Sequence, residues 1–380
     1  MNISYITTFD ANEIKSFSGI GYYISKALKN QGYNLDIIGN LDDNNRNNKL
    51  IHLKSIYYNK IIRKKFLINR DQAVVKSYAK SILRCLKPNT DLIFSVGTIP
   101  IALLNPSKPT VFYADACFAG MINFYESYSN LCNETIKSGN LLEQKALDIV
   151  SLAIYSSDWA AETAIKSYNI NPQKVKVVPF GANLEEEKKY NEIKSIIASR
   201  STTECHLLFL GKDWKRKGGD MALKIALKLN EIGLKTTLHI AGVKEVALKN
   251  IPPCVISYGF INKATPEGKK LIENLLSKSH FLILPTRADC TPVVYSEASS
   301  FGLPCISTNV GGIPTIIKDN VNGKLFSLED NEDAYVNYIQ KTFCNISLYK
   351  QLCYNSFNEY EQRLNWKVAG TSIKSLINNL

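Results

Sequence analysis

Short apolar runs alternate with amphipathic stretches along most of this chain of 380 residues. The apolar runs have the length and the Ile, Val, Phe and Tyr content of strands, and the stretches between them carry apolar residues at helical spacing. For example, Ile20, Ile24 and Leu28 recur four positions apart, and Gly32 follows them as a stop signal. The pattern predicts an α/β protein with parallel strands and right-handed helical crossovers.

The predicted strands form two series, one on each side of a polar stretch at 185–203 that shows no strand alternation. A chain of this length accommodates two domains, and each series predicts an open doubly wound sheet. Such sheets bind ligands at the carboxyl ends of their strands, so two facing sheets would place a site in the cleft between them. The predicted strands are 3–7, 33–38, 91–96, 110–113, 152–156 and 174–178, then 206–210, 237–240, 255–258, 281–284, 305–308 and 324–326.

The composition is that of an ordinary globular protein, with 45% hydrophobic and 21% charged residues. No apolar run reaches the roughly 18 residues of a membrane span, and the N-terminus reads as a strand rather than a signal peptide, so we expect a cytoplasmic protein. The nine cysteines never form a C-x-x-C pair, and we expect them to be reduced and buried. We expect the histidines to be satisfied residues of strands, and no motif predicts a metal site.

Positive charge is concentrated over 54–87, where ten basic residues face a single acid, Asp71. Ile, Tyr, Phe and Leu residues are interleaved with these charges, as in basic amphipathic elements that lie on anionic lipid headgroups. A solvated basic helix face explains the same pattern. We expect no nucleic-acid partner, because no recognised binding motif accompanies the charge.

The segment 284–314 combines two acids with a predicted helix start. Asp289 follows the apolar strand 281–284, a helix opens near Pro292, and Glu297 lies eight positions after the first acid. The start of a helix presents free backbone N–H groups to an anion. The arrangement therefore suits a ligand that carries both phosphate and hydroxyl groups.

A second segment, 207–220, suits a pyrophosphate. Its strand ends at Gly211, and Lys212, Arg216 and Lys217 precede a helix that begins near Gly219. A guanidinium grips phosphate in two places and an ammonium in one, so Arg216 would supply the two-pronged contact that Lys212 cannot make. A solvated basic turn is the alternative.

These two segments resemble the donor-site signature of retaining glycosyltransferases of family 4, also called glycosyl transferases group 1, which have the GT-B fold. The signature has two Glu residues separated by seven positions, and here Asp289 and Glu297 stand in that relation. The resemblance implies two Rossmann-like domains that face a central cleft. It implies an acceptor-side domain at 1–190, a donor-binding domain at 191–360, and a helix at 361–380 that crosses back.

The resemblance also implies roles for single residues. Lys212 and Lys217 match the Arg and Lys that hold the donor diphosphate, and Glu297 matches the acid that binds the ribose hydroxyls. Asp289 would face the donor sugar. The backbone N–H groups of Thr291, Val293 and Val294, around Pro292, would meet the phosphate or the sugar. Thr291 and Pro292 stand where the family commonly has Phe-Gly, which bears on sugar specificity.

In the first domain, Gly19 and Gly21 follow the first strand, where the family loop approaches the diphosphate and the acceptor. An ordinary tight turn explains these two glycines nearly as well. Asp115 follows the predicted strand 110–113, where the family often has a His that bonds the transferred sugar.

The resemblance implies a metal-independent, retaining hexosyltransferase, which we expect to act in surface polysaccharide or glycolipid assembly. Its donor is a nucleotide diphosphate sugar, its acceptor a glycan, a lipid-linked sugar or a protein, and no cofactor is required. The catalytic set is Asp289, Asp115 and Lys217, with the protein on the inner face of the membrane through 54–87. Two alternatives stay open: a nucleotide-sugar epimerase of the same fold, and a partner subunit that binds donor without transferring it.

Overall fold

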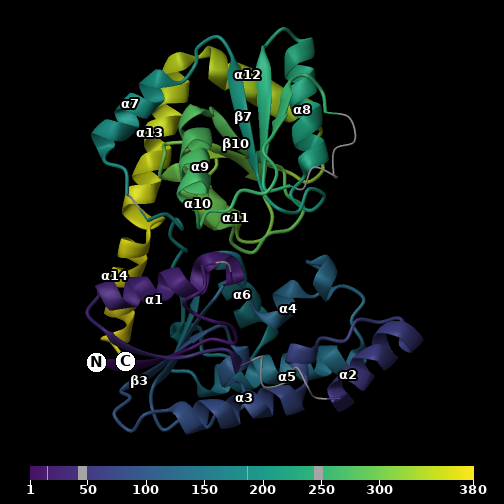
Figure 1. Ribbon diagram of the computed structural model, residues 1–380, viewed down its shortest axis with the longest axis vertical. Helices are drawn as coiled ribbons and strands as arrows, with labels where there is room; N and C mark the ends of the chain where they lie inside the picture. The colour runs from purple at the N-terminus through teal and green to yellow at the C-terminus, as the bar shows by residue number, and fades with distance from the viewer. Residues whose placement is uncertain (15, 42–48, 186, 244–250) are drawn as a thin grey trace. The chain divides into compact units, whose positions relative to one another are not determined.

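The computed structural model describes residues 1–14, 16–41, 49–185, 187–243 and 251–380 (Figure 1). The chain divides into two compact units. The N-terminal unit contains Met1–Pro179 and the last residues, Ala369–Leu380, and the C-terminal unit contains Phe180–Val368. The sequence predicts the change of domain near 190.

The N-terminal unit is built on a parallel sheet of six strands in the order β2-β1-β3-β4-β5-β6. The chain order of the strands reverses between β1 and β3. The strands are β1 (Asn2–Ile6), β2 (Asn34–Ile38), β3 (Leu92–Val96), β4 (Thr110–Ala114), β5 (Leu152–Tyr155) and β6 (Val175–Val177). The longer helices are α1 (Ile20–Asn30), α2 (Lys49–Ile56), α3 (Gln72–Cys85), α5 (Asn133–Ile149) and α6 (Asp158–Ser167), and α4 (Phe118–Met121) is a single turn (Figure 1).

The C-terminal unit has a second parallel sheet, in the order β12-β11-β10-β7-β8-β9, which reverses between β7 and β10. This is the strand order of dinucleotide-binding Rossmann domains. The strands are β7 (Cys205–Leu210), β8 (Thr236–Ala241), β9 (Val255–Ser257), β10 (Phe281–Leu284), β11 (Cys305–Thr308) and β12 (Gly323–Phe326). The helices are α7 (Tyr190–Ser199), α8 (Gly219–Glu231), α9 (Pro266–Lys278), α10 (Val293–Ser299), α11 (Ile313–Ile316), α12 (Glu332–Cys344), α13 (Ile346–Arg363) and the start of α14 (Trp366–Ile377).

Both sheets are buried on two faces, which explains why their strands read as continuous apolar runs. Every residue of β3, β4, β10 and β11 is buried. In a parallel sheet the crossover helices cover both faces, so the strands consist largely of apolar residues. The predicted pair of Rossmann-like units is confirmed.

The polar stretch 185–203 shows no strand, and it contains a helix, α7, whose residues Ile193 and Ile197 are one turn apart and both buried. Two predictions about local structure need correction. The predicted amphipathic element 54–87 is interrupted: the π-helix η3 (Tyr57–Ile62) and the turn η4 (Ile68–Arg70) separate α2 from α3. Cys85 and Cys344 are exposed and Cys254 is partly exposed, whereas the other six cysteines are buried.

A buried arginine, Arg200, fixes the end of α10. It donates to the carbonyl oxygens of Phe301 and Gly302, both at 2.8 Å, and to that of Ser277 at 3.0 Å. Phe301 and Gly302 follow the C-cap residue of α10, Ser300, so the guanidinium holds the turn by which the chain leaves this helix. The contact ties α10 and α9 to the segment that enters the unit's first strand.

Three of the four histidines meet in the C-terminal unit. His239 Nε2 lies 3.2 Å from His206 Nδ1, and its Nδ1 lies 3.0 Å from the hydroxyl of Tyr258. His280 Nδ1 accepts the backbone N–H of His206 at 2.9 Å, and its Nε2 lies 2.7 Å from the carbonyl of Ser201. The histidines of the strands are thus satisfied, as predicted, whereas His52 lies exposed on α2.

The hydrogen bond from the His206 N–H requires a neutral imidazole ring at His280. Because His280 Nδ1 accepts a hydrogen bond, the ring's single N–H hydrogen is on Nε2. Burial lowers the pKa of His280 to about 4. Burial, reinforced by the nearby charge of Lys278, lowers the pKa of His239 to about 3. Lys235 and Glu204 are the other charged groups that act on His206.

The histidines should make the C-terminal unit sensitive to acid. Between pH 6.5 and 4, His280 and His239 bind protons in the unfolded chain but stay largely neutral in the folded protein. The free energy of unfolding therefore falls as the pH decreases through this window, and it levels off at lower pH. At pH 5 we expect each to contribute a loss on the order of 2 kcal/mol relative to pH 7.5.

The measurement is urea unfolding of the intact protein at pH 7.5 and pH 5. Replacement of His280 by Asn keeps an acceptor for the His206 N–H, and we expect it to reduce the loss of stability between the two pH values. His52→Asn, on the exposed surface, is the matched control and should leave the loss unchanged. An equal loss in wild type and His280→Asn would contradict the assignment.

Candidate functional site

The predicted donor-site segments follow the two strands at the reversal of the C-terminal sheet. The loop 211–218 follows β7, and the loop 285–292 follows β10, which pairs with β7. In open α/β sheets, the crevice outside the carboxyl ends of the strands at such a reversal is where ligands bind. The topology therefore brings together two segments that are far apart in the sequence.

Arg216 and Lys217 meet Asp289 across these two loops. Lys217 Nζ forms a close ion pair with Asp289 Oδ2, and Arg216 Nη1 lies 3.2 Å from the same oxygen. Arg216 also donates to the carbonyl of Ala288 at 2.7 Å and pairs with Asp213 at 3.3 Å. Lys217 is 8% exposed and Asp289 is 6% exposed. The structure thus places three predicted site residues in one largely dehydrated cluster.

Gly218 explains how the two loops come so close. Its φ is 75°, in the left-handed region, and a Cβ on it would lie 1.9 Å from the carbonyl oxygen of Pro285. Only glycine avoids both the strain and the clash. The backbone of Arg216 is held from the other loop, because its carbonyl accepts the N–H of Arg287 at 2.8 Å and the hydroxyl of Thr286 at 3.0 Å.

Glu297 is 1% exposed on α10 and pairs with Lys263. Lys263 Nζ lies 2.5 Å from Glu297 Oε2, while the lysine side chain itself is 38% exposed. Lys263 belongs to the loop after β9, so it reaches the same carboxyl edge of the sheet. Sequence reasoning missed this residue, although its position after a strand of the sheet is a usable signal.

Gly211 lies against the side chain of Lys217, because a Cβ on it would be 3.2 Å from Lys217 Cγ, whereas Lys212 points to another part of this edge. Lys212 is exposed, and its Nζ lies 5.6 Å from the centre of the Phe260 ring rather than beside Arg216 and Lys217. Gly211 donates to the carbonyl of Ala241 at 3.0 Å, and Gly242 donates to that of Gly259 at 2.7 Å. Glycines at these strand ends keep the backbone open to a ligand.

The residues at the start of α10 are arranged nearly as expected. Pro292 is the N-cap residue, so the helix begins at Val293. The backbone N–H groups of Val293 and Val294 therefore lie in the first turn, where a helix has no internal acceptors for them. Thr291 is buried and donates its hydroxyl to the carbonyl of Cys290 at 2.7 Å.

The predicted residues of the N-terminal unit also lie at carboxyl ends of strands. Gly19 has a φ of 81° and caps α1 after the loop that follows β1. Gly21 accepts the hydroxyl of Tyr5 at 2.6 Å, and a Cβ on it would lie 2.6 Å from the ring of Phe9. Asp115 follows β4 and is partly exposed. The predicted cleft between the two units stays a prediction.

Within the described ranges, no group of three or more His, Cys, Asp or Glu side chains is placed so that it could hold a metal ion. Over the same residues, no helix has both the length and the hydropathy to cross a bilayer.

The Lys263–Glu297 pair generates a test of the site's electrostatics. We expect Lys263→Met to destabilise the protein by about 1 to 3 kcal/mol, because it leaves a buried carboxylate without its cation. Lys269→Met is the matched control: Lys269 pairs with Glu185, both side chains are about 40% exposed, and such pairs contribute little. Thermal unfolding measures both, and the double variant Lys263→Met/Glu297→Gln should recover most of the loss. Equal effects of the two lysine variants would contradict the prediction.

Comparison with known proteins agrees with this geometry. Residues 204–345 match the family model of glycosyl transferases group 1. An uncharacterised 41.2 kDa protein in the cps region of Klebsiella pneumoniae is 27% identical over 60% of this chain and 60% of its own length. The Escherichia coli UDP-Gal:alpha-D-GlcNAc-diphosphoundecaprenol alpha-1,3-galactosyltransferase is 25% identical over 46% of this chain and 47% of its own length.

The matches to these curated relatives span less than two thirds of their lengths. Among solved structures, sucrose-phosphate synthase from Thermosynechococcus elongatus superposes with a TM-score of 0.71 at 15% identity, covering 100% of this chain and 98% of the other. That likeness shows the fold. The chain therefore has the GT-B fold, and its residues 204–345 match the model of the glycosyl transferases group 1 family.

Proposed function

We propose that this protein transfers a sugar from a nucleotide diphosphate sugar to an acceptor hydroxyl, with retention of anomeric configuration and without a metal ion. The observation that carries the proposal is the contact of Arg216 and Lys217 with Asp289 at the reversal of the C-terminal sheet. All three residues lie within the range that matches the group 1 family model. Two cations beside a carboxylate suit a ligand that joins a diphosphate to a hydroxylated ring.

In the proposed reaction the diphosphate competes with Asp289 for the two cations. Negative charge grows on the leaving diphosphate as the glycosidic bond breaks, so Arg216 and Lys217 stabilise the transition state more than the ground state. Asp289, released from the cations, accepts hydrogen bonds from the sugar and orients it. The leaving phosphate assists deprotonation of the acceptor on the same face, which gives retention.

The remaining predicted residues complete the proposed site. Glu297 accepts hydrogen bonds from the ribose hydroxyls, and Lys263 holds its carboxylate in place. Lys212 and the N–H groups of the first turn of α10 add contacts to the donor. Gly19, Gly21 and Asp115 belong to the acceptor side. The donor is a substrate, and the proposal includes no cofactor.

We place the reaction in surface polysaccharide or glycolipid assembly. The names of the relatives support this, because one lies in a cps region and another acts on a diphosphoundecaprenol-linked sugar. The acceptor is then a glycan, a lipid-linked sugar or a protein. The proposed location is the inner face of the membrane, with contact through the basic segment 54–87.

The decisive experiment is a thermal-shift screen of the intact protein against UDP-, GDP- and ADP-sugars. A donor that binds the folded state raises the unfolding temperature with its occupancy. Incubation of that donor without acceptor then separates transfer from epimerisation. Binding without any product, with every acceptor class supplied, would favour the non-catalytic alternative, and the anomeric configuration of the product tests retention.

Lys217→Met should lower kcat by about 10²- to 10³-fold, because it removes one donor to the developing charge on the diphosphate. Lys215→Met is the matched control, since Lys215 lies exposed in the same loop, and its kcat should stay near that of wild type. Initial rates of nucleotide diphosphate release measure both. An Asp289→Ala variant with normal kcat would remove Asp289 from the catalytic set.

A further inference from the structure

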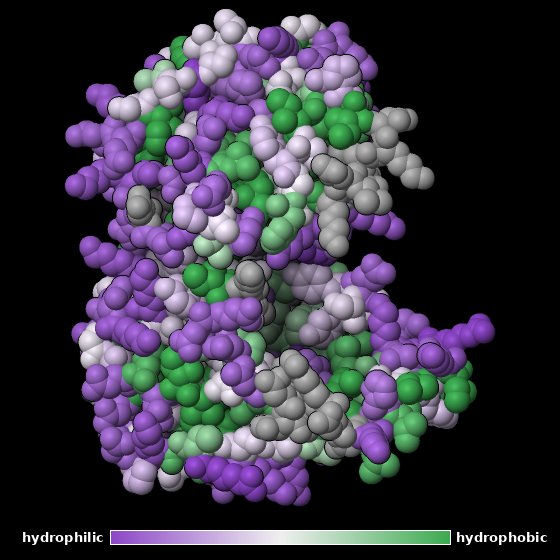
Figure 2. Space-filling view, viewed as in Figure 1, coloured by the Kyte–Doolittle hydropathy of each residue, from purple (hydrophilic) through white to green (hydrophobic). Residues whose placement is uncertain are grey.

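One helix of the N-terminal unit carries its apolar side chains on the side that faces solvent. Leu50 and Leu53 on α2 are 78% and 61% exposed, and Tyr57 and Ile61 on η3 are 47% and 67% exposed. These four positions recur at three- and four-residue spacing, so they form one stripe along α2 and η3. We call this stripe the outer face. Figure 2 shows hydrophobic surface at the lower right, where Figure 1 places α2.

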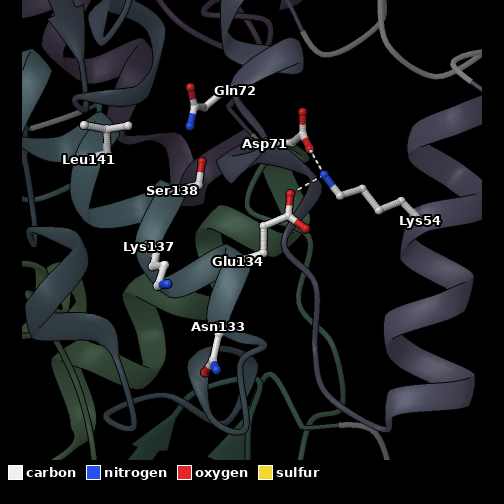
Figure 3. Close-up of a pocket in the computed structure, with 8 residues that line it drawn as sticks. All are labelled: Lys54, Asp71, Gln72, Asn133, Glu134, Lys137, Ser138 and Leu141. Atoms are coloured by element: carbon white, nitrogen blue, oxygen red, sulfur yellow. Dashed lines mark hydrogen bonds and ion pairs between the residues drawn. The ribbon is translucent and has the colours of Figure 1, made fainter.

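The neighbouring face of the same helix, which carries Ile51, Lys54, Ser55 and Tyr58, is attached to the domain largely by polar groups. Lys54 forms ion pairs with Asp71, at 2.8 Å, and with Glu134. Tyr58 donates to Glu134 at 2.9 Å and stacks on Phe66 with ring centres 5.5 Å apart. Figure 3 shows Lys54 reaching from α2 to both carboxylates, beside a polar pocket of about 490 Å³.

This arrangement is the reverse of a surface helix of a globular protein. Such a helix buries its apolar stripe and exposes its charges. Here Ile51 is the only buried residue of α2, while the large apolar residues point to water. Exposed apolar patches of this kind on a folded protein mark interaction sites. The element is anchored by its polar side, which leaves the outer face available for a partner.

The charges around the outer face indicate which partner fits. Lys49, Lys60, Arg63 and Lys64 are exposed, and the sequence 49–70 contains no Asp or Glu. Arg63 ends η3 in the left-handed conformation, with a φ of 57°, and the chain then returns to the domain at Lys65, which pairs with Leu131. The cations therefore cluster at the end of the stripe. Apolar side chains bordered by cations without acids complement a surface that has both an apolar interior and negative headgroups.

We propose that the outer face of α2 and η3 inserts into an anionic lipid surface, with Lys60, Arg63 and Lys64 at the headgroups. This inference rests on the proposed membrane location of the protein but not on sugar transfer. The inference also limits the membrane contact to one part of the basic segment 54–87. The helix α3 lies in the same segment, but its apolar face is buried in the core through Val74, Val75 and Ile82.

The test is flotation of the intact protein with vesicles of phosphatidylcholine alone or mixed with phosphatidylglycerol. Wild type should float with the anionic vesicles, and added salt should weaken this binding. The variant Leu53→Gln/Tyr57→Gln/Ile61→Gln should bind the anionic vesicles at least about tenfold more weakly than wild type. Leu83→Gln is the matched control, because Leu83 is 54% exposed on α3, and it should float as wild type does.

Two further measurements keep the outcomes distinct. The variant Lys60→Gln/Arg63→Gln/Lys64→Gln should lose the preference for anionic vesicles, and the unfolding temperatures of all variants should match wild type because the replaced groups are exposed. Equal flotation of the outer-face variant and wild type would overturn the proposal. A wild-type dimer that the outer-face variant dissociates would assign the face to a second copy instead. Donor thermal shifts should be unaffected, so failure here leaves the proposed function standing.

Discussion

The ion pair between Lys217 and Asp289 is the contact on which the candidate site depends. It joins the loops that follow β7 and β10, and Arg216 strengthens it at 3.2 Å. Both partners are less than a tenth exposed, so each charge is balanced by the other rather than by water. In the proposed function, a donor diphosphate replaces the carboxylate as the counter-charge of both cations.

The sheet topology makes this contact possible. In the C-terminal unit the strand order reverses between β7 and β10, so consecutive positions at the sheet edge are filled from distant parts of the chain. Gly218 then permits the close approach that brings Lys217 to Asp289. Arg200 fixes the turn that follows α10, the helix that carries Glu297, by donating to the carbonyl groups of Phe301 and Gly302. The approach of the two loops thus depends on Gly218, and the position of α10 depends on Arg200.

The N-terminal unit shows a different use of charge. In α2 the ion pairs of Lys54 with Asp71 and Glu134 hold the helix to the domain, which leaves its apolar residues outside. Burying those residues against the domain would have been the usual solution for a soluble protein. In our proposals the helix meets a second apolar surface, and the cluster around Asp289 meets an anion.

The sequence alone determined the order and the approximate bounds of the strands, because parallel strands buried on both faces read as apolar runs bounded by polar turns. It also determined that acids and cations follow the strands of the second sheet. Tertiary structure decided which of them meet: Arg216 and Lys217 contact Asp289, Lys212 lies over Phe260, and Lys263 pairs with Glu297. It also decided the orientation of α2 and the helix α7. Local spacing fixes which residues share a face, but the direction of that face depends on long-range contacts such as that of Lys54 with Glu134.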